Sequence, residues 1–367
     1  MAGLYIHVPF CHSKCIYCDF YSTPGHRTDG WAERFVDTII CEWNRRKSEI
    51  AGRYDTVYIG GGTPSVLPGH ELERLIGSLG LENKITEFTV EVNPEDVTPE
   101  LLTTLRDASV NRLSMGIQSF DDRLLAILGR RHKAQDAVDA INLMRQSGFQ
   151  NISGDIIYGL PGQGLDDWKR ELDRMMQLNL PHMSAYLLSY EPGTRLTLLR
   201  DRGELAEADE ELANAMYSVL TDVARSNGYE HYEISNFAKP GHRAIHNSNY
   251  WKGIPYLGLG PGAHSWDSNL RRYNPSNLTQ YVAQKGNTMC IEQETETERI
   301  NDDIVTGLRT ADGLNLNRFD TSVADRILSN ARSRLEDGTL VLYSNRHIAI
   351  PERFMLISDL IIVDLLL

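Results

Sequence analysis

Cysteine is scarce in this sequence, with only 5 cysteines in a chain of 367 residues. An odd count in a long chain argues against a disulfide framework of the kind found in secreted proteins. The N-terminus also lacks a basic region followed by an apolar stretch, so we expect no signal peptide. Both absences favour the cytoplasm as the location of the protein.

Long hydrophobic runs and an excess of positive charge are missing as well. The longest apolar run, 354–367, contains Asp359 and Asp364 and is too short and too charged to span a bilayer. Lys and Arg number 37 against 50 Asp and Glu, which gives a formal net charge of −13. Such an acidic chain is a poor non-specific partner for nucleic acid or an anionic membrane. We expect no nucleic-acid partner and no membrane span, and we leave peripheral membrane contact open.

What is present is an ordinary globular composition, with 41% hydrophobic and 24% charged residues. These values exclude a disordered, collagen-like or low-complexity chain. The length favours one large domain accompanied by a smaller one, and no internal repeat is visible.

Short apolar runs rich in Val, Ile and Tyr alternate with helical patterns as far as residue 228. Runs of this kind are typical of buried parallel strands. The strand candidates are 4–8, 56–60, 87–92, 112–118, 152–158 and 183–188. The helix candidates are 31–49, 71–80, 99–107, 121–128, 134–147, 167–179 and 207–227. Six βα units in series predict an α/β fold with a parallel sheet, either doubly wound and open or a full or partial barrel.

The composition changes near Tyr229. Residues 229–277 are rich in Gly, Pro, Asn, His and aromatics, which predicts a loop-heavy segment with a functional role. Helices are then expected at 297–309, 316–319 and 321–337, a hairpin at 339–342 and 347–350, and a last helix from Arg353. Helices followed by a small hairpin resemble a winged-helix module. We therefore divide the chain into a barrel domain (1–228), a loop-rich segment that completes the core (229–290) and a winged-helix-like domain (291–367).

Three of the five cysteines lie close together, directly after the first expected strand. Cys11, Cys15 and Cys18 form the pattern Cys-x3-Cys-x2-Cys. Buried thiols that pack as small apolar groups are one alternative. Zinc is another, with His7 or His12 as a fourth ligand. Three thiolates in one tight loop suit an iron–sulfur cluster better, and a cubane held by three of them leaves one iron open for chemistry.

Polar or glycine residues also lie in or directly after the later strands. The residues are Gly61, Gly62, Thr63, Glu91, Gln118 and Asp155. Each has an ordinary alternative, because glycines form turns and strand-end carboxylates are often simply solvated. In a βα barrel, however, the carboxyl ends of all strands form one rim. Glycines would let backbone amides approach a ligand there, and carboxylates would accept hydrogen bonds from ribose hydroxyls.

The cysteine loop with Tyr17 before its third cysteine, together with the glycine turn at 60–63, resembles the radical S-adenosylmethionine (SAM) superfamily. The resemblance implies that Cys11, Cys15 and Cys18 hold a 4Fe-4S cluster whose open iron binds the amino and carboxylate groups of SAM. It also implies a partial (β/α)6 barrel. In this superfamily, reductive cleavage of SAM yields a 5′-deoxyadenosyl radical.

The motifs at 91–95, 114–120, 154–162 and 256–265 narrow the resemblance to the oxygen-independent coproporphyrinogen III oxidase branch, over essentially the whole chain. The implied SAM-binding residues are Tyr5, Tyr17, Gly61, Gly62, Thr63, Glu91, Gln118, Arg130 and Asp155. Tyr17 would lie beside the cluster. Arg130 has an ordinary alternative as a charge at the C-terminal turn of a helix.

Two subfamilies compete within this branch, the oxidases and the HemW heme chaperones. The oxidase pattern has a further cysteine where this chain has Phe20, and a longer segment before its cluster. The segment His246-Asn247-x-x-Tyr250-Trp251 matches the HemW motif. Tyr and Trp offer flat apolar faces for a porphyrin, and imidazole is a standard axial ligand of heme iron. His246, Asn247, Tyr250 and Trp251 are therefore the heme-binding candidates.

The resemblance implies a heme chaperone that binds heme, a 4Fe-4S cluster and SAM, and delivers heme to recipient hemoproteins. A reductant protein for the cluster is a further implied partner. No catalytic residue is assigned, and cleavage of SAM is left open. One alternative is oxidative decarboxylation of coproporphyrinogen III to protoporphyrinogen IX, against which Phe20 argues. The other is a non-catalytic iron–sulfur protein, which would not need the rim residues.

Overall fold

The computed structural model describes residues 1–24, 30–50, 53–81 and 85–367. The six predicted strands are present as β1 (Ala2–Val8), β4 (Tyr54–Gly61), β5 (Glu87–Val92), β6 (Arg112–Gln118), β7 (Ile152–Tyr158) and β8 (His182–Leu187). They pair in parallel in this order. The prediction of an α/β fold built on a parallel sheet is therefore confirmed.

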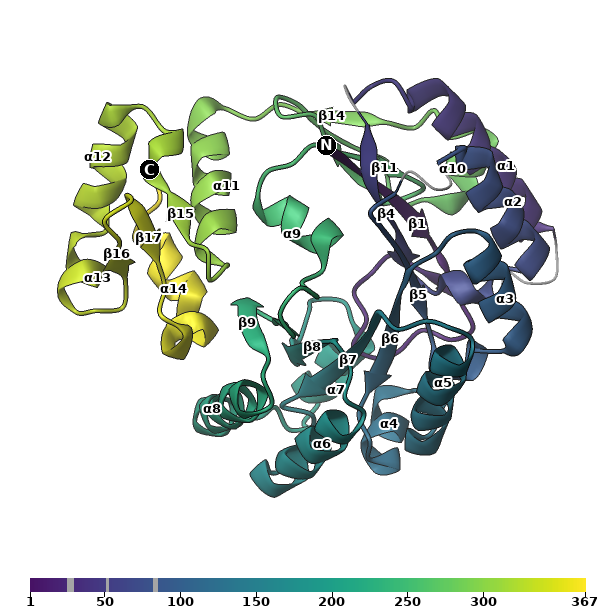
Figure 1. Cartoon of the computed structure of the whole chain (residues 1–367), viewed down its shortest axis with the longest axis horizontal. Helices are drawn as coiled ribbons and strands as arrows, with labels where there is room; N and C mark the ends of the chain where they lie inside the picture. Colours follow the sequence, from purple (N-terminus) through teal and green to yellow (C-terminus); the bar gives the residue numbers. More distant parts are fainter. Residues whose placement is uncertain (25–29, 51–52, 82–84) are drawn as a thin grey trace.

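Helices cover the outer face of this curved sheet (Figure 1). They are α1 (Trp31–Arg46), α2 (Gly69–Leu79), α3 (Pro99–Asp107), α4 (Asp122–Leu128), α5 (Ala134–Gln146), α6 (Leu165–Gln177) and α8 (Glu210–Ser226). The short helix α7 (Arg195–Asp201) instead packs against the cysteine loop, where the Leu196 amide donates to the Ile16 carbonyl at 2.8 Å. Capping side chains fix the N-terminal ends of several of these helices. Thr98 precedes α3, and its hydroxyl accepts from the Leu101 amide at 3.2 Å. Asp209 caps α8 in the same way, through the Leu212 amide at 2.8 Å.

The segment expected to be loop-heavy instead extends the sheet at both edges, so that part of the prediction is wrong. It contains β9 (Glu230–Glu233), β10 (Asn236–Ala238), α9 (Ile245–Trp251), β11 (Tyr256–Leu259), β12 (His264–Trp266) and β13 (Arg271–Tyr273), and α10 (Leu278–Ala283) and β14 (Cys290–Glu292) follow it. β11 pairs in parallel with β1, and β10 pairs antiparallel with β8. Strands of three or four residues carry too little alternation to be recognised in a sequence.

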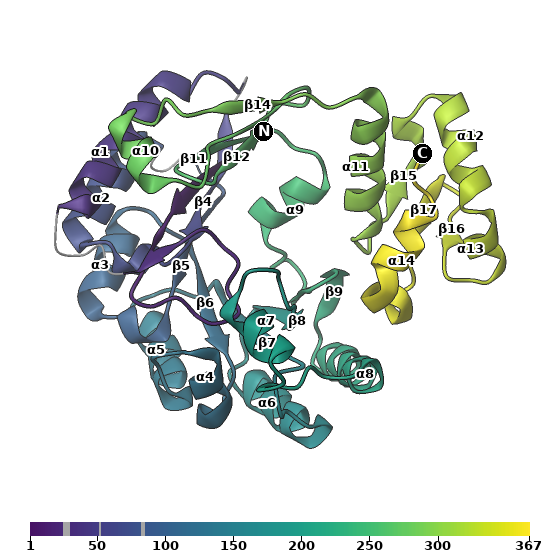
Figure 2. The same cartoon turned by 180° about the vertical axis from the view of Figure 1, so that it is seen from behind.

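The complete sheet has the order β14-β13-β12-β11-β1-β4-β5-β6-β7-β8-β10-β9. It curves without closing, and α9 lies between its two edges (Figures 1 and 2). The carboxylate of Glu87, from β5, accepts from the amides of Ile245 and His246 at 2.8 and 2.7 Å. A barrel strand therefore fixes the start of α9.

The C-terminal residues form a separate group of helices beside the barrel (Figure 1). They comprise α11 (Glu296–Leu308), β15 (Leu314–Asn315), α12 (Thr321–Asn330), α13 (Arg332–Glu336), β16 (Val341–Leu342), β17 (His347–Ala349) and α14 (Ser358–Val363), with short 3-10 turns at Leu316–Arg318 and Glu352–Ile357. The hairpin β16–β17 lies where the sequence predicts it, and β15 completes a small antiparallel sheet. The predicted helix 321–337 is two helices. The domain boundaries at 228 and 290 remain a prediction.

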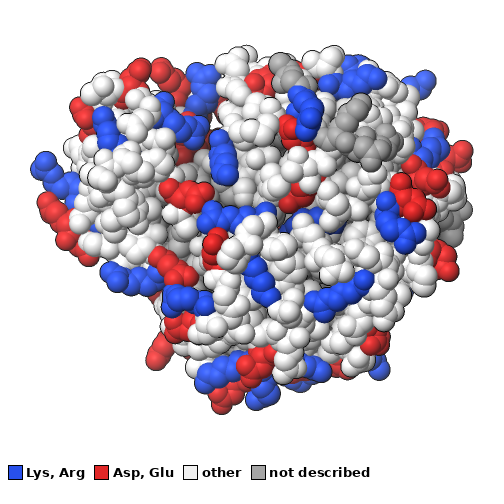
Figure 3. Space-filling model, in the orientation of Figure 1, with Lys and Arg blue, Asp and Glu red and all other residues white. Residues whose placement is uncertain are grey.

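Two surface properties complete the description. Within the described ranges, no helix combines the length and the hydropathy that crossing a membrane requires. Acidic and basic side chains are interspersed over the face drawn in Figure 3.

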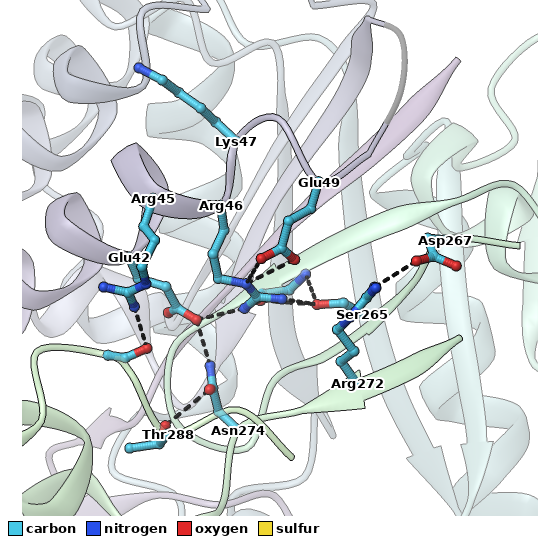
Figure 4. Close-up of polar contacts among 12 residues, drawn as sticks. Glu42, Arg45, Arg46, Lys47, Glu49, Ser265, Asp267, Arg272, Asn274 and Thr288 are labelled. Atoms are coloured by element: carbon cyan, nitrogen blue, oxygen red, sulfur yellow. Dashed lines mark hydrogen bonds and ion pairs between the residues drawn. The ribbon is translucent and has the colours of Figure 1, made fainter. Parts of the chain in front are cut away.

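A buried ion pair joins α1 to the last parallel strand (Figure 4). Glu42 is 0% and Arg46 3% exposed, and Arg46 Nη1 donates to Glu42 Oε1 at 2.6 Å. Arg46 also donates to the Gly258 carbonyl and to Ser265 Oγ, at 3.1 and 3.0 Å. The amide of Gly260 donates to Glu42 Oε2 at 3.0 Å. Further donors to this carboxylate are Asn274 and Tyr281. The pair therefore holds β11 and the turn after it against α1.

Removal of the Glu42 carboxylate should destabilise the fold strongly, because it leaves Arg46 with only the partly exposed Glu49 as its counter-charge and leaves the buried donors from Gly260, Asn274 and Tyr281 without their acceptor. We expect Glu42→Leu to lower the free energy of unfolding by about 3–5 kcal/mol, measured by urea denaturation. Asp166→Ala is the control, since Asp166 pairs with Lys169 on the exposed side of α6 and little change is expected. Equal effects of the two substitutions would contradict this account.

Candidate functional site

The three clustered cysteines lie in the loop after β1, which also contains the short paired strands β2 (Phe10–Cys11) and β3 (Thr23–Pro24). Cys11, Cys15 and Cys18 are partly buried and line a cavity of about 530 Å³. The cavity extends from this loop into the barrel between β4 and β8. Its volume is in the range of roughly 300–1,000 Å³ that is usual for small-molecule and cofactor sites.

The cavity gathers most of the residues that the sequence singled out. Those lining it are Tyr17, Gly61, Gly62, Thr63, Glu91, Gln118, Arg130 and Asp155. They meet there because the parallel strands bring their carboxyl ends to one rim. Tyr5 lies deeper, in the middle of β1, and its hydroxyl is 2.9 Å from Nδ1 of His7. Tyr5 lines an adjoining cavity instead.

The glycine turn after β4 holds the cysteine loop in place. The amide of Gly62 donates to the Val8 carbonyl at 2.8 Å, and the amide of Thr63 donates to the Phe10 carbonyl at 2.7 Å. The amide of Gly61 donates to the Glu91 carboxylate at 3.1 Å. All three amides thus have protein acceptors in this structure, and the expectation that they approach a ligand stays a prediction.

Glycine is required in this turn because the two segments approach closely. A Cβ atom on Gly61, where φ is +104°, would lie 2.3 Å from His7 Nδ1. A Cβ atom on Gly62 would lie 2.7 Å from the carbonyl oxygens of Val8 and Phe10. Neither distance is compatible with a side chain.

Two partly buried carboxylates face the cavity, Glu91 from β5 and Asp155 from β7, with β6 between the two strands. Burial raises the pKa of Glu91 to about 7, and the nearby charge of Asp155 adds to the rise. Tyr58 donates its hydroxyl proton to Glu91 at 2.6 Å, which opposes the rise. Burial also raises the pKa of Asp155, against hydrogen bonds from the hydroxyls of Ser114 and Ser153. A cationic ligand would favour the ionised form of both groups.

Gln118 and Arg130 are held by the end of β6. Gln118 has φ +66°, a left-handed conformation that costs a non-glycine residue about 1–3 kcal/mol and is frequent at functional sites. Arg130 Nη2 donates to Asn93 Oδ1 at 2.8 Å and to the Gly116 carbonyl at 2.9 Å. Arg130 is therefore held by hydrogen bonds at the cavity and is not simply a charge at the C-terminal turn of a helix.

A second cavity of about 480 Å³ adjoins the first, beside α9. Its aromatic lining residues are Tyr5, Phe20, Tyr58, Tyr186, Tyr250 and Trp251. The residues that line both cavities are Phe20, Tyr58, Gly61, Glu91, Tyr186 and Asn247. Phe20 is 67% exposed, so its ring lies at the entrance. The two cavities therefore share one wall.

His246 and Asn247 also line the second cavity, so the four heme-binding candidates lie together. His246 is only 2% exposed. Its Nδ1 is 2.9 Å from Thr56 Oγ1, and its Nε2 is 2.9 Å from the Tyr250 hydroxyl. Burial, helped by the charge of Arg112, lowers the pKa of His246 to about 3. Coordination of iron by Nε2 would have to replace the bond to Tyr250.

The comparisons with known proteins agree with this geometry. Residues 5–175 match the family model described as the radical SAM superfamily. The heme chaperone HemW of Lactococcus lactis is 35% identical over 86% of this chain and 83% of its own length. HemW of Bacillus subtilis is 36% identical over 87% of this chain and 86% of its own length. The chain belongs to the HemW family.

The structure of Escherichia coli coproporphyrinogen III oxidase (HemN), described as a radical SAM enzyme, superimposes with a TM-score of 0.84. The superposition covers 99% of this chain and 89% of the HemN chain. The two sequences are 23% identical, so the likeness concerns the fold. Membership of the radical SAM superfamily implies a 4Fe-4S cluster and SAM as cofactors.

The environment of the three cysteines fits such a cluster. Thr63 Oγ1 donates to Cys11 Sγ and Arg130 Nη1 donates to Cys15 Sγ, both at 3.6 Å. Donors aimed at sulfur stabilise thiolates. Burial raises the pKa of Cys18 to about 11, so metal binding must displace a proton from it. In the described part of the chain, no three His, Cys, Asp or Glu side chains converge on a single ion, and a cubane offers each thiolate its own iron.

Sequence reasoning missed several residues of the cavity wall. The missed residues include Tyr58, Asn93, Arg112, Ser114, Ser184 and Tyr186. On β6 the lining positions are every second residue from Arg112 to Gln118. This is the period of a strand with one face toward the cavity, and that signal could have found Arg112 and Ser114.

A side chain on Gly61 should separate the glycine turn from the cysteine loop. We expect Gly61→Ala to lower the free energy of unfolding by more than about 1 kcal/mol and to reduce uptake of iron. Gly77→Ala is the matched control, because Gly77 lies within helix α2 with open space around it. Alanine there should stabilise the protein by up to about 1 kcal/mol. Denaturant unfolding of both variants checks the pair, and the same sign for both would refute it.

Proposed function

We propose that this protein is a cytoplasmic heme chaperone that binds heme, a 4Fe-4S cluster and SAM, and delivers heme to recipient hemoproteins. One observation carries the proposal. A cavity lined by three cysteines shares a wall with a cavity lined by aromatic rings. Relatives of this chain in Lactococcus lactis and Bacillus subtilis bear the name heme chaperone.

In this proposal Cys11, Cys15 and Cys18 hold the cluster, which supplies an open iron and, from a reductant protein, an electron. Thr63 and Arg130 donate to two of the sulfurs and stabilise them as thiolates. Tyr17, between Cys15 and Cys18 in the same loop, also lines the cavity. The loop remains in place because the glycine turn binds its backbone.

SAM would lie in the cysteine-lined cavity, whose carboxylates suit its positive charge. Glu91 and Asp155 would accept from the ribose hydroxyls, as carboxylates do in nucleotide sites. Without a ligand, burial raises the pKa of each carboxyl group. The positive charge of bound SAM would lower both pKa values and so favour the ionised carboxylates. Gln118, whose backbone is held in a left-handed conformation, would complete the contacts.

Heme would occupy the aromatic cavity. Its apolar ring matches the faces of Tyr250 and Trp251, and Phe20 at the entrance would cover the exposed side. His246 and Asn247, on α9, complete this wall. Because α9 lies between the sheet edges, its small displacement would open the cavity toward a recipient hemoprotein.

Loss of either buried carboxylate should weaken SAM binding. We expect Glu91→Gln and Asp155→Asn each to lower the affinity for SAM about tenfold or more, which corresponds to the loss of one charged hydrogen bond. The iron content should stay unchanged. Glu171→Gln is the matched control, since Glu171 is a buried, hydrogen-bonded carboxylate on α6 outside the cysteine-lined cavity. Isothermal titration under anaerobic conditions measures the affinities; unchanged values in both variants would remove these residues from the site.

Heme binding should depend on the aromatic wall. We expect Trp251→Ala to lower the affinity for heme about tenfold or more through lost ring contact, and His246→Ala to alter the Soret spectrum. Tyr343→Ala removes an exposed aromatic ring from the C-terminal hairpin and should change nothing. Spectroscopic heme titration measures all three variants.

Assays on the reconstituted wild-type protein distinguish the chaperone function from the oxidase function. With cluster and SAM loaded, the wild-type protein should transfer heme to an apo-hemoprotein and leave coproporphyrinogen III unchanged. Turnover of coproporphyrinogen III, together with heme affinity no greater than that of an unrelated acidic protein, would replace the proposal by the oxidase. Tight cluster binding with neither heme nor SAM binding would indicate a non-catalytic iron–sulfur protein.

A further inference from the structure

The donors to two cysteine sulfurs are connected to each other through one side chain, Asn93, which directly follows β5. Arg130 Nη2 donates to Asn93 Oδ1 at 2.8 Å, and Asn93 Nδ2 donates to Thr63 Oγ1 at 3.1 Å. Thr63 then donates to Cys11 Sγ, while Nη1 of the same guanidinium donates to Cys15 Sγ, both at 3.6 Å. The chain of bonds therefore begins at Arg130 and ends at two sulfurs.

The direction of every bond in this chain follows from the chemistry of its members. A guanidinium has donors only, so the Asn93 carbonyl oxygen must face Arg130. The Asn93 amide nitrogen must then face Thr63 and donate to its hydroxyl oxygen. Because that oxygen already accepts a hydrogen bond, the hydroxyl proton is free to point at Cys11. An asparagine at this position thus sets the orientation of the Thr63 proton.

We propose that Asn93 is a positioning residue that aims Thr63 and Arg130 at the cysteine sulfurs and so raises the reduction potential of the bound cluster. The inference rests on the proposed function, since it requires the cluster on Cys11 and Cys15. Reduction adds negative charge to a cluster, and hydrogen bonds to its sulfurs stabilise that charge. Asn93 touches neither sulfur and acts through its two neighbours.

The test is the midpoint potential of the anaerobically reconstituted, SAM-free protein, measured by a redox titration followed by electron paramagnetic resonance. We expect Asn93→Ala to make the potential more negative, with a change of about tenfold in the reduction equilibrium, or about 59 mV for a one-electron couple. Asn111→Ala is the matched control. Asn111 also uses both ends of its amide, toward the Phe88 amide and the Thr86 carbonyl, and its removal should leave the potential unchanged.

A double-mutant cycle with Thr63→Val separates positioning from general disturbance. Thr63→Val keeps the side-chain shape, loses the donor to Cys11 and should shift the potential in the same direction. If Asn93 acts through Thr63, the shift in the double variant falls short of the sum of the single shifts. Full additivity, or an unchanged potential in Asn93→Ala, would overturn the inference.

The remaining outcomes are also decisive. If Asn93→Ala takes up less iron than the wild type, the potential of Thr63→Val becomes the test. A Thr63→Val potential equal to that of the wild type then overturns the inference. A wild-type chain that forms no four-iron cluster would overturn the proposed function and this inference together. A wild-type cluster whose potential is the same in all variants would overturn the inference only.

Discussion

Close backbone contact between the glycine turn after β4 and the cysteine loop after β1 is the constraint on which the rest of this structure depends. The amides of Gly62 and Thr63 bind the carbonyls of Val8 and Phe10, and side chains on the glycines would prevent the contact. This contact sets the cysteine loop over the barrel mouth. It also places Thr63 next to Cys11, so one turn both anchors the loop and supplies a donor to a sulfur.

The second organising feature is the open side of the barrel. The sheet does not close, and α9 lies between its edges, tied to β5 by the carboxylate of Glu87 and to β4 by the bond between Thr56 and His246. The aromatic cavity forms where α9 meets the barrel wall. Because Tyr58 and Glu91 line both cavities, a ligand in one lies against the wall of the other.

The sequence predicted the barrel well and its edges poorly, for physical reasons. The strands 87–92, 112–118 and 152–158 are buried apolar runs bounded by turns, and they appear with the predicted ends. The edge strands between 230 and 292 are too short to show a period, and their pairing with distant strands decides their conformation. Spacing identified the cysteine loop and the rim residues, since parallel strands bring their ends together. It could not reveal that the glycine amides bind the cysteine loop, that Nδ1 of His246 meets Thr56 on β4, or that Asn93 links Arg130 to Thr63, because these contacts join residues far apart in the chain.

The central claim is that the chain holds a cluster and a heme in neighbouring but separate sites. The most direct measurement is the content of non-heme iron and acid-labile sulfide per chain, before and after saturation of the anaerobically reconstituted protein with heme. The account predicts about four non-heme irons per chain in both states, as a cubane requires, with one heme bound in addition. Loss of cluster iron as heme binds, or a single zinc in place of the four irons, would contradict it.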